Sequence, residues 1–276
     1  MTYSKFDTKL PFPDIFPKAW DSEMGARDFV AFRNLDHFKH HVSKLTQRED
    51  SKCGVSYREA LSDLMLGKSN FPETERAEIR NLVRSNLHKR GLITEEVYEA
   101  YQYSVDGTNV GVDVGKYAAG EPDCVITPSK EYVDFFYELY VSISYYHGVA
   151  DEDVRRNTAK LLATIEELER QHIFIKITLV FPDRYCAEDE NGNDTRNFFS
   201  SIPLFSHKDP KSVEIMSSVV NERLLRKFYF AILESFYGKD LASGYGIPVD
   251  LTGVMNIGSR FDEIAFFSDV LEKVGA

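Results

Sequence analysis

The chain has 276 residues, which is enough to bury a core without disulfides or metals. Its 43% of hydrophobic and 28% of charged residues are ordinary for a globular protein and exclude wholesale disorder. The formal net charge of -11 argues against binding to bulk duplex DNA or to an anionic membrane, because phosphate contacts need Lys and Arg.

Three cysteines, Cys53, Cys124 and Cys186, lie far apart and form no CxxC pair. This spacing argues against a disulfide framework and against a zinc ribbon, and it favours a reducing compartment. The first residues contain no apolar signal region, and no 18-residue apolar run occurs. We therefore expect a cytoplasmic protein with no membrane partner.

The N-terminal half begins with a proline-rich arm and a short strand at 28–33, and then its apolar spacing predicts helices. Ser56 and Glu59 form a capping-box pattern at the start of the second helix, and Gly67 is expected to end it. The third helix should bury Ile79, Leu82, Val83 and Leu87. The expected helices are 35–46, 57–66, 73–90 and 94–103, followed by a glycine-rich loop over 106–128 with a short strand near 110–114.

The C-terminal half changes to apolar, β-branched runs separated by one long helical stretch. A strand at 133–144, a helix from Asp151 and a strand at 173–181 predict a parallel βαβ unit. We expect an antiparallel edge strand at 202–205, a strand at 249–255, and helices at 212–237 and 259–274. The fold class is therefore α/β with a three-layer mixed sheet, in which 1–128 forms an N-terminal helical extension and 129–276 the α/β domain; one continuous domain is the alternative.

The end of the first long strand reads Tyr140-Val141-Ser142-Ile143-Ser144. It resembles the Asp-x-Ser-x-Ser metal motif of von Willebrand A-type domains, and the order of elements that follows resembles theirs too. Tyr140 stands where that family has the Asp, so the main charge of a hard-cation site is missing. The resemblance implies the von Willebrand A-like fold without a metal; that the two serines carry no meaning is the alternative.

The segment VDVGKYAAGEPDC at 112–124 resembles a "VDVxxYLxGEPEC" string found in a family of uncharacterised phage and mobile-element proteins. The helix pieces LLRKFYF at 224–230 and YREAL at 57–61 resemble further parts of that family. The resemblance implies a phage or mobile-element origin and action inside an infected bacterial cell. It implies no activity.

An acidic loop is the first candidate for chemistry. Asp113, Glu121 and Asp123 could hold Mg²⁺ or act as acid and base, which would make the protein a magnesium-dependent enzyme. Glu121-Pro122-Asp123 after a glycine is also ordinary turn chemistry, and we favour this structural interpretation. No nucleophile elbow, phosphate loop or zinc motif occurs elsewhere, and His37 and His41 are interpreted as surface residues.

Two basic groups are candidates for binding nucleic acid or a partner protein. Arg76, Arg80 and Arg84 recur every four residues on the third helix, with Tyr98 and Tyr101 following as candidates for base stacking. Arg223, Arg226 and Lys227 cluster on the long C-terminal helix. The competing interpretation is a solvated face whose arginines pair with nearby glutamates.

The pattern as a whole favours a non-catalytic protein-interaction platform that needs no cofactor and no metal. A single-stranded nucleic-acid-binding adaptor and a magnesium-dependent enzyme are the alternatives. The partner is expected to be a protein of unstated identity.

Overall fold

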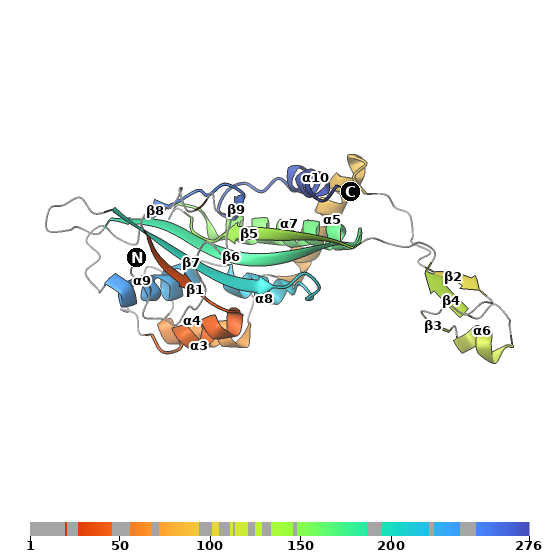
Figure 1. The fold of residues 1–276 in the computed structure, drawn as a ribbon, viewed down its shortest axis with the longest axis horizontal. Helices are drawn as coiled ribbons and strands as arrows, with labels where there is room; N and C mark the ends of the chain where they lie inside the picture. The colour runs from red at the N-terminus through yellow and green to blue at the C-terminus, as the bar shows by residue number, and fades with distance from the viewer. Residues whose placement is uncertain are drawn as a thin grey trace.

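The chain folds around one large mixed β-sheet covered by helices (Figure 1). The structure is a computed structural model, and it describes residues 20, 27–45, 56–67, 72–93, 101–104, 111–112, 114–120, 125–128, 134–145, 148–186, 195–220, 224–237 and 247–275.

The large sheet has the strand order β1-β7-β6-β5-β9, and β8 also pairs with β6. Strand β5 lies parallel to β6 and to β9, whereas β7 is antiparallel to β6. The mixed α/β class and the predicted parallel βαβ unit are therefore confirmed. Its strands are β1 (Arg27–Ala31), β5 (Phe135–Ser142), β6 (Ile173–Cys186), β7 (Thr195–Phe205), β8 (Ile247–Pro248) and β9 (Val254–Asn256).

Strand β7 is longer than the predicted edge strand at 202–205, and its antiparallel pairing with β6 is confirmed. Residues 197–201 of β7 are interior, because β1 pairs with them in parallel on the other side. The register with β1 ends at Ser201, so Pro203 lies on a part of β7 that β1 does not pair, next to an irregularity in the register between Ile177 and Thr178.

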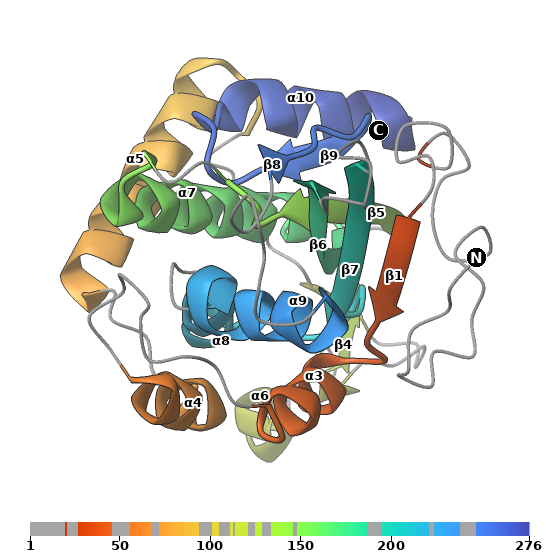
Figure 2. The same ribbon diagram turned by 90° about the vertical axis from the view of Figure 1, so that its left-hand side faces the viewer.

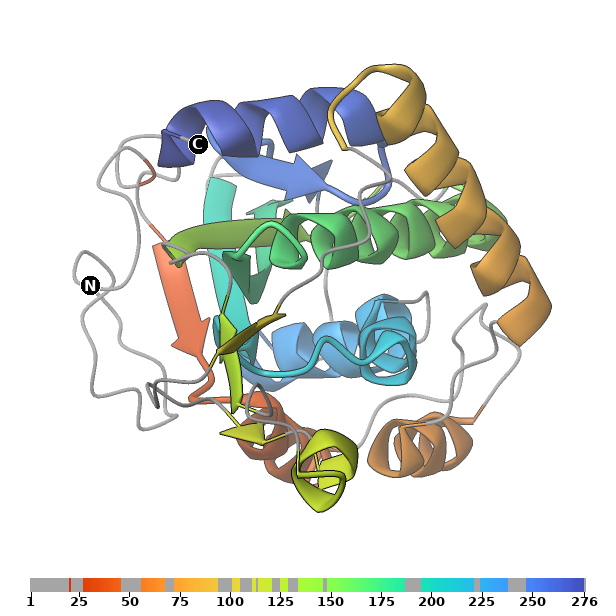
Figure 3. The same ribbon diagram turned by 90° about the vertical axis from the view of Figure 1, so that its right-hand side faces the viewer.

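Helices cover one face of this sheet, where the alternate residues of β5 and β6 are apolar. Figures 2 and 3 show α7 (Asp151–Glu169), α8 (Val213–Val219) and α9 (Phe230–Tyr237) together on that side. Leu139 and Val141 of β5 and Ile175, Ile177 and Leu179 of β6 are buried in the main core with Leu161 and Ile165 of α7. The alternating apolar residues of the two strands and the apolar side of α7 pack against each other in this layer.

The opposite face has a smaller cover. Trp20 is fully buried there, and its Nε1 donates a hydrogen bond to the carbonyl of Thr252 at 2.8 Å. Around it, a second core contains Phe29, Val180, Phe199 and Leu251. This cover, the sheet and the helical side form three layers.

The N-terminal helices share the main core with the C-terminal half, so a boundary at 128 does not separate two cores. They are α3 (Leu35–Val42), α4 (Tyr57–Leu66) and α5 (Glu73–Lys89). The capping box of Ser56 with Glu59 is present, and Gly67 ends α4 with φ 61, which confirms the prediction. In α5, Ile79, Val83 and Leu87 are buried, but Leu82 is 43% exposed and does not belong to the buried stripe.

The predicted single helix over 212–237 is wrong. α8 ends at Val219, a π-helix, η1 (Leu224–Tyr229), follows, and α9 begins at Phe230. The last helix, α10 (Glu263–Val274), is confirmed in its C-terminal part and begins after the N-cap Asp262.

A small three-stranded sheet lies apart from the large one (Figure 1). It contains β2 (Tyr101–Ser104), β3 (Gly111–Val112) and β4 (Val125–Pro128), in the order β2-β4-β3, and α6 (Val114–Ala118) follows β3. Residues 101–103, predicted to end a helix, are thus in a strand. The rest of that predicted helix lies outside the described residues.

Candidate functional site

A buried polar centre lies where β5 ends beside β6. The Ser144 hydroxyl donates a hydrogen bond to the Asp183 carboxylate, and the Ser144 backbone N–H donates to the Ser142 hydroxyl at 3.3 Å. Burial raises the pKa of Asp183 to about 7, although hydrogen bonds from Ser144 and Tyr229 oppose this rise. A carboxyl with such a pKa exchanges its proton near neutral pH.

The π-helix η1 brings Tyr229 to this centre. The Tyr229 ring stacks on Phe181 with centroids 4.3 Å apart, and its hydroxyl donates to the Phe181 carbonyl at 3.4 Å. π-Helical turns inside α-helices frequently accompany functional positions. Here the turn places Tyr229 beside Asp183, whose carboxyl pKa is raised.

The polar centre is closed to a substrate, because Ser142, Ser144 and Asp183 are all buried. Strand β8 pairs with β6 at this point, where Pro248 lies opposite Asp183. Its chemistry is therefore that of an internal proton-binding group that affects stability, rather than that of an exposed acid or base.

Tyr140 does not join Ser142 and Ser144 in a metal-like group. Its ring packs edge-on against Trp20 with centroids 4.9 Å apart, and its hydroxyl donates to Glu138 at 2.9 Å. In the part of the chain that the structure describes, no group of three or more His, Cys, Asp or Glu side chains is placed to hold a metal ion.

The arginine stripe of α5 is not a free cationic surface. Arg76 pairs with Glu73 and is only 13% exposed. Arg80 Nε lies 2.9 Å from Glu166 Oε2 of α7, and Arg84 Nε lies 3.9 Å from Glu167 Oε1. The prediction that the arginines share a face of α5 is compatible with these contacts, but the face is turned towards α7 and paired with carboxylates.

A hollow of about 200 Å³ lies beside this stripe between α5 and α7. Its charged wall is formed by Arg76, Arg80, Glu166, Glu169 and Lys211. Lys211 Nζ lies 2.6 Å from Glu169 Oε1, so the cations of the wall all have carboxylate partners. The hollow therefore presents no excess positive charge to an anion.

The second basic cluster also differs from the prediction. Lys227 is only 1% exposed and is part of the interior, so it cannot meet a phosphate at the surface. Arg226 lies in η1, and Tyr101 lies in β2, where it pairs with Pro128. Arg223, Tyr98, and the acidic-loop residues Asp113, Glu121, Pro122 and Asp123 lie outside the described residues, so their proposed roles stay predictions.

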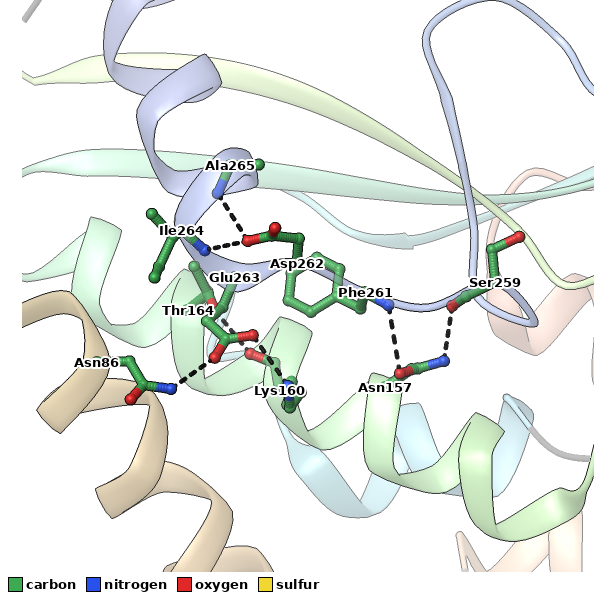
Figure 4. A network of polar contacts seen from close by, with 10 residues as sticks. All are labelled: Asn86, Asn157, Lys160, Thr164, Ser259, Phe261, Asp262, Glu263, Ile264 and Ala265. Carbon is green, nitrogen blue, oxygen red and sulfur yellow. Dashed lines mark hydrogen bonds and ion pairs between the residues drawn. The ribbon is translucent and has the colours of Figure 1, made fainter. Parts of the chain in front are cut away.

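A polar seam joins α5, α7 and the start of α10 (Figure 4). Glu263 accepts hydrogen bonds from Asn86 Nδ2 at 2.8 Å and from Lys160 Nζ at 3.0 Å. Burial raises the pKa of Glu263, but hydrogen bonds from its backbone, Asn86 and Lys160 outweigh burial and lower it overall. Next to this group, Asn157 donates to the carbonyls of Ile257 and Ser259 at 3.0 and 2.7 Å, which fixes the loop after β9.

The sheet face opposite the helices carries, at the amino end of β5 and β6, a pair of aromatic residues that the sequence did not lead us to expect. Phe136 of β5 is 52% exposed and lies in register with Phe174 of β6, with ring centroids 6.1 Å apart. Lys208 Nζ lies 5.6 Å from the first ring centroid and 5.2 Å from the second. The His207 ring packs edge-on against Phe136 at 5.2 Å.

The small sheet is a further candidate region. Its outer strands, β2 and β3, each pair only with β4 among the described residues. On α6, Tyr117 is 69% exposed. The helix α6 and strand β3 contain the first part of the segment 112–124 that the sequence analysis singled out.

The chain was compared with known proteins. A family model described as a domain of unknown function, DUF7192, matches residues 23–269, which include both β1 and most of α10. No curated protein and no solved structure matches the chain. None of the described helices combines the length and the apolar character needed to cross a bilayer.

Proposed function

The chain belongs to the DUF7192 family, and we propose that it acts as a non-catalytic protein-interaction platform. From the resemblance of residues 112–124 to a phage and mobile-element string, we further propose a place of action. The platform works in the cytoplasm of an infected bacterial cell, in phage replication, transcription or takeover of the host.

The observation that carries this proposal is the small sheet of β2, β4 and β3. An outer strand presents backbone N–H and C=O groups that can pair with a strand of another chain. The strands have only two to four residues each, and so small a sheet gains most of its stability by packing against something larger. A partner protein that adds a strand or covers one face would supply that packing.

Tyr117 is the proposed anchor of this interface. A tyrosine that is 69% exposed can bury a large apolar ring and still hydrogen-bond through its hydroxyl. Such residues are over-represented among the few that contribute most to binding energy.

The test is capture of partners from infected cells with the tagged full chain, followed by titration of the purified partner. We expect Tyr117→Ala to weaken binding by about tenfold or more, as for a central aromatic anchor. Leu82→Ala is the matched control, because Leu82 is an exposed apolar residue on α5 of the large body. It should leave the affinity unchanged.

Two results would contradict the proposal. One is a partner whose affinity is the same for the wild type and for Tyr117→Ala. The other is metal-dependent hydrolysis by the purified chain that is lost in Asp113→Asn, since this would favour the acidic-loop enzyme instead.

A further inference from the structure

The aromatic pair lies at the amino end of β5 and β6. Phe136 and Phe174 project from these neighbouring parallel strands on the face opposite the helices, and their ring planes are inclined by 30°. Phe136 leaves half of its side chain in water and so forgoes much of its hydrophobic stabilisation, whereas Phe174 is partly buried. The two rings side by side therefore indicate a surface that binds something flat.

Charged side chains of both signs border the two rings. Lys208 lies over both rings, and Lys176, the next outward-facing residue of β6, is paired with Glu138 at 2.7 Å. Lys208 is also paired with Asp134 at 2.7 Å and is 63% exposed. Ion pairs at such exposed positions contribute little to stability, so a competing anion can replace the carboxylates.

We propose that this surface, formed by Phe136, Phe174, Lys176 and Lys208, binds single-stranded nucleic acid. Nucleobases stack on the two phenylalanine rings, and the adjoining phosphates contact the two lysine ammonium groups. Stacking on aromatic side chains of a sheet is a general way to hold unpaired bases, and it tolerates any sequence because every base has a π-face.

The chemistry of the surface favours this ligand over two others. A duplex keeps its bases stacked on one another, so it cannot offer their faces to Phe136 and Phe174. The net charge of -11 also repels the dense charge of a duplex, whereas a short single strand needs only the local lysines. An apolar protein surface would complement the rings but would bring Lys176 and Lys208 no anion beyond Glu138 and Asp134.

This site goes beyond the proposed protein interface, because it lies on the large sheet and uses other residues. With both sites, the chain would connect a protein partner to a single strand. The two proposals fail separately, since an oligonucleotide titration of the purified chain involves neither Tyr117 nor any partner.

The experiment is fluorescence anisotropy of a labelled oligodeoxythymidine of about twelve nucleotides, which suits a site of this size, titrated with the full chain at low salt. We expect saturable binding, and about tenfold or weaker affinity in the double variant Phe136→Ala, Phe174→Ala. Leu82→Ala is the control, with unchanged affinity. Thermal unfolding of each variant checks that the fold is retained.

A second pair of variants tests the phosphate contacts. Changing both lysines, Lys176→Gln and Lys208→Gln, should reduce the slope of log affinity against log salt by about 0.7 for each lost contact. Glu138→Gln removes the carboxylate that competes for Lys176 and should strengthen binding.

Three outcomes would overturn the proposal. They are a flat titration at low salt, equal affinity for the matching duplex, and unchanged affinity in the folded Phe136→Ala, Phe174→Ala variant. If Arg80→Glu abolishes binding while the phenylalanine variant retains it, the ligand binds at α5 and this surface is not the site.

Discussion

The two ends of the sheet face opposite the helices use the same kind of side chain for opposite purposes. At the carboxyl end of β5, Tyr140 and Phe199 are packed under Trp20, which is fully buried. At the amino end, no residue that the structure describes buries Phe136 in this way, and Phe136 is half exposed. An aromatic on a strand therefore gains its role from what lies above it: burial makes it part of the core, and exposure makes it a candidate for recognition.

The largest expected effect is at the covered end. Trp20→Ala should lower the free energy of unfolding by about 3 to 5 kcal/mol, because it leaves a cavity over Tyr140 and Phe199 and removes the hydrogen bond to Thr252. Urea unfolding followed by far-UV circular dichroism measures this, since Trp20 is the single tryptophan and its fluorescence would be lost. A cost below about 1 kcal/mol would mean that the two ends do not differ in the way described.

The second effect depends on pH and concerns the buried Asp183, which lies where β5 ends beside β6. The folded-state pKa of Asp183, about 7, lies above the ordinary 3.8, so the folded state holds this proton more tightly than the unfolded state. The stability that the protonated group contributes is present below about pH 4 and is lost as the pH rises from about 4 to about 7.

Asp183→Asn removes the titrating carboxyl group, and with it the loss of stability between about pH 4 and about pH 7. The stability of the variant should match that of the wild type near pH 4 and exceed it at pH 8 by about 4 kcal/mol. Denaturant unfolding at the two pH values measures the difference, and Glu272→Gln, at an exposed carboxylate of α10, is the matched control. A gain of the same size at both pH values would contradict a buried titrating Asp183.

At the open end, Phe136→Ala should cost only about 1 kcal/mol, because half of the ring is already in water. The losses of unfolding free energy in Phe136→Ala and Trp20→Ala, measured under the same conditions, give the ratio of the two effects. If Phe136→Ala costs as much as Trp20→Ala, then the open end is covered in solution.

The smallest effect concerns Tyr140, which links the two ends. Its ring contacts Trp20 and its hydroxyl donates to Glu138 beside the open end. Tyr140→Phe keeps the ring and removes one partly exposed hydrogen bond, so it should cost about 0.5 kcal/mol in chemical unfolding. A cost several times larger would show that Tyr140 holds the two ends together through its hydroxyl.

Much of the fold could be predicted because local signals and the global fold agree. The Ser56 and Glu59 capping box, the stop at Gly67 and the isoleucine alternation of β6 each specify an element without reference to the rest of the chain. The parallel pairing of β5 with β6 follows from the helix between them.

The predictions fail where contacts between residues far apart in the sequence determine the structure. Nothing local indicates that β1 would cover the outer edge of β7, and Leu82 follows the apolar spacing of α5 while its position on the helix faces solvent. The sequence around Lys227 reads as a basic surface, but the π-helical turn of η1 places this side chain in the interior. Propensity and spacing carry no information on these choices.

The sequence of β6 does contain a pattern that indicates the aromatic pair. In β6, Phe174, Lys176 and Thr178 alternate with three isoleucines, so one face of the strand is mixed in character rather than fully apolar. Glu138 repeats this pattern on β5, beside Lys176. The apolar, β-branched residues of both strands drew attention away from this surface. The hydrogen bond from Ser144 to Asp183, in contrast, depends on the register of two strands and could not be read from either one.

The pairing of β1 with β7 also constrains how the protein is made. Arg27–Ala31 hydrogen-bond with residues 197–201, so β1 must wait until most of the chain has been synthesised before its place in the sheet exists. During that interval Phe29 and Val30, both destined for the interior, have no native neighbour on β7. A nascent chain halted before residue 195 would therefore expose them, and it would be a natural substrate for chaperones and proteases of the cell.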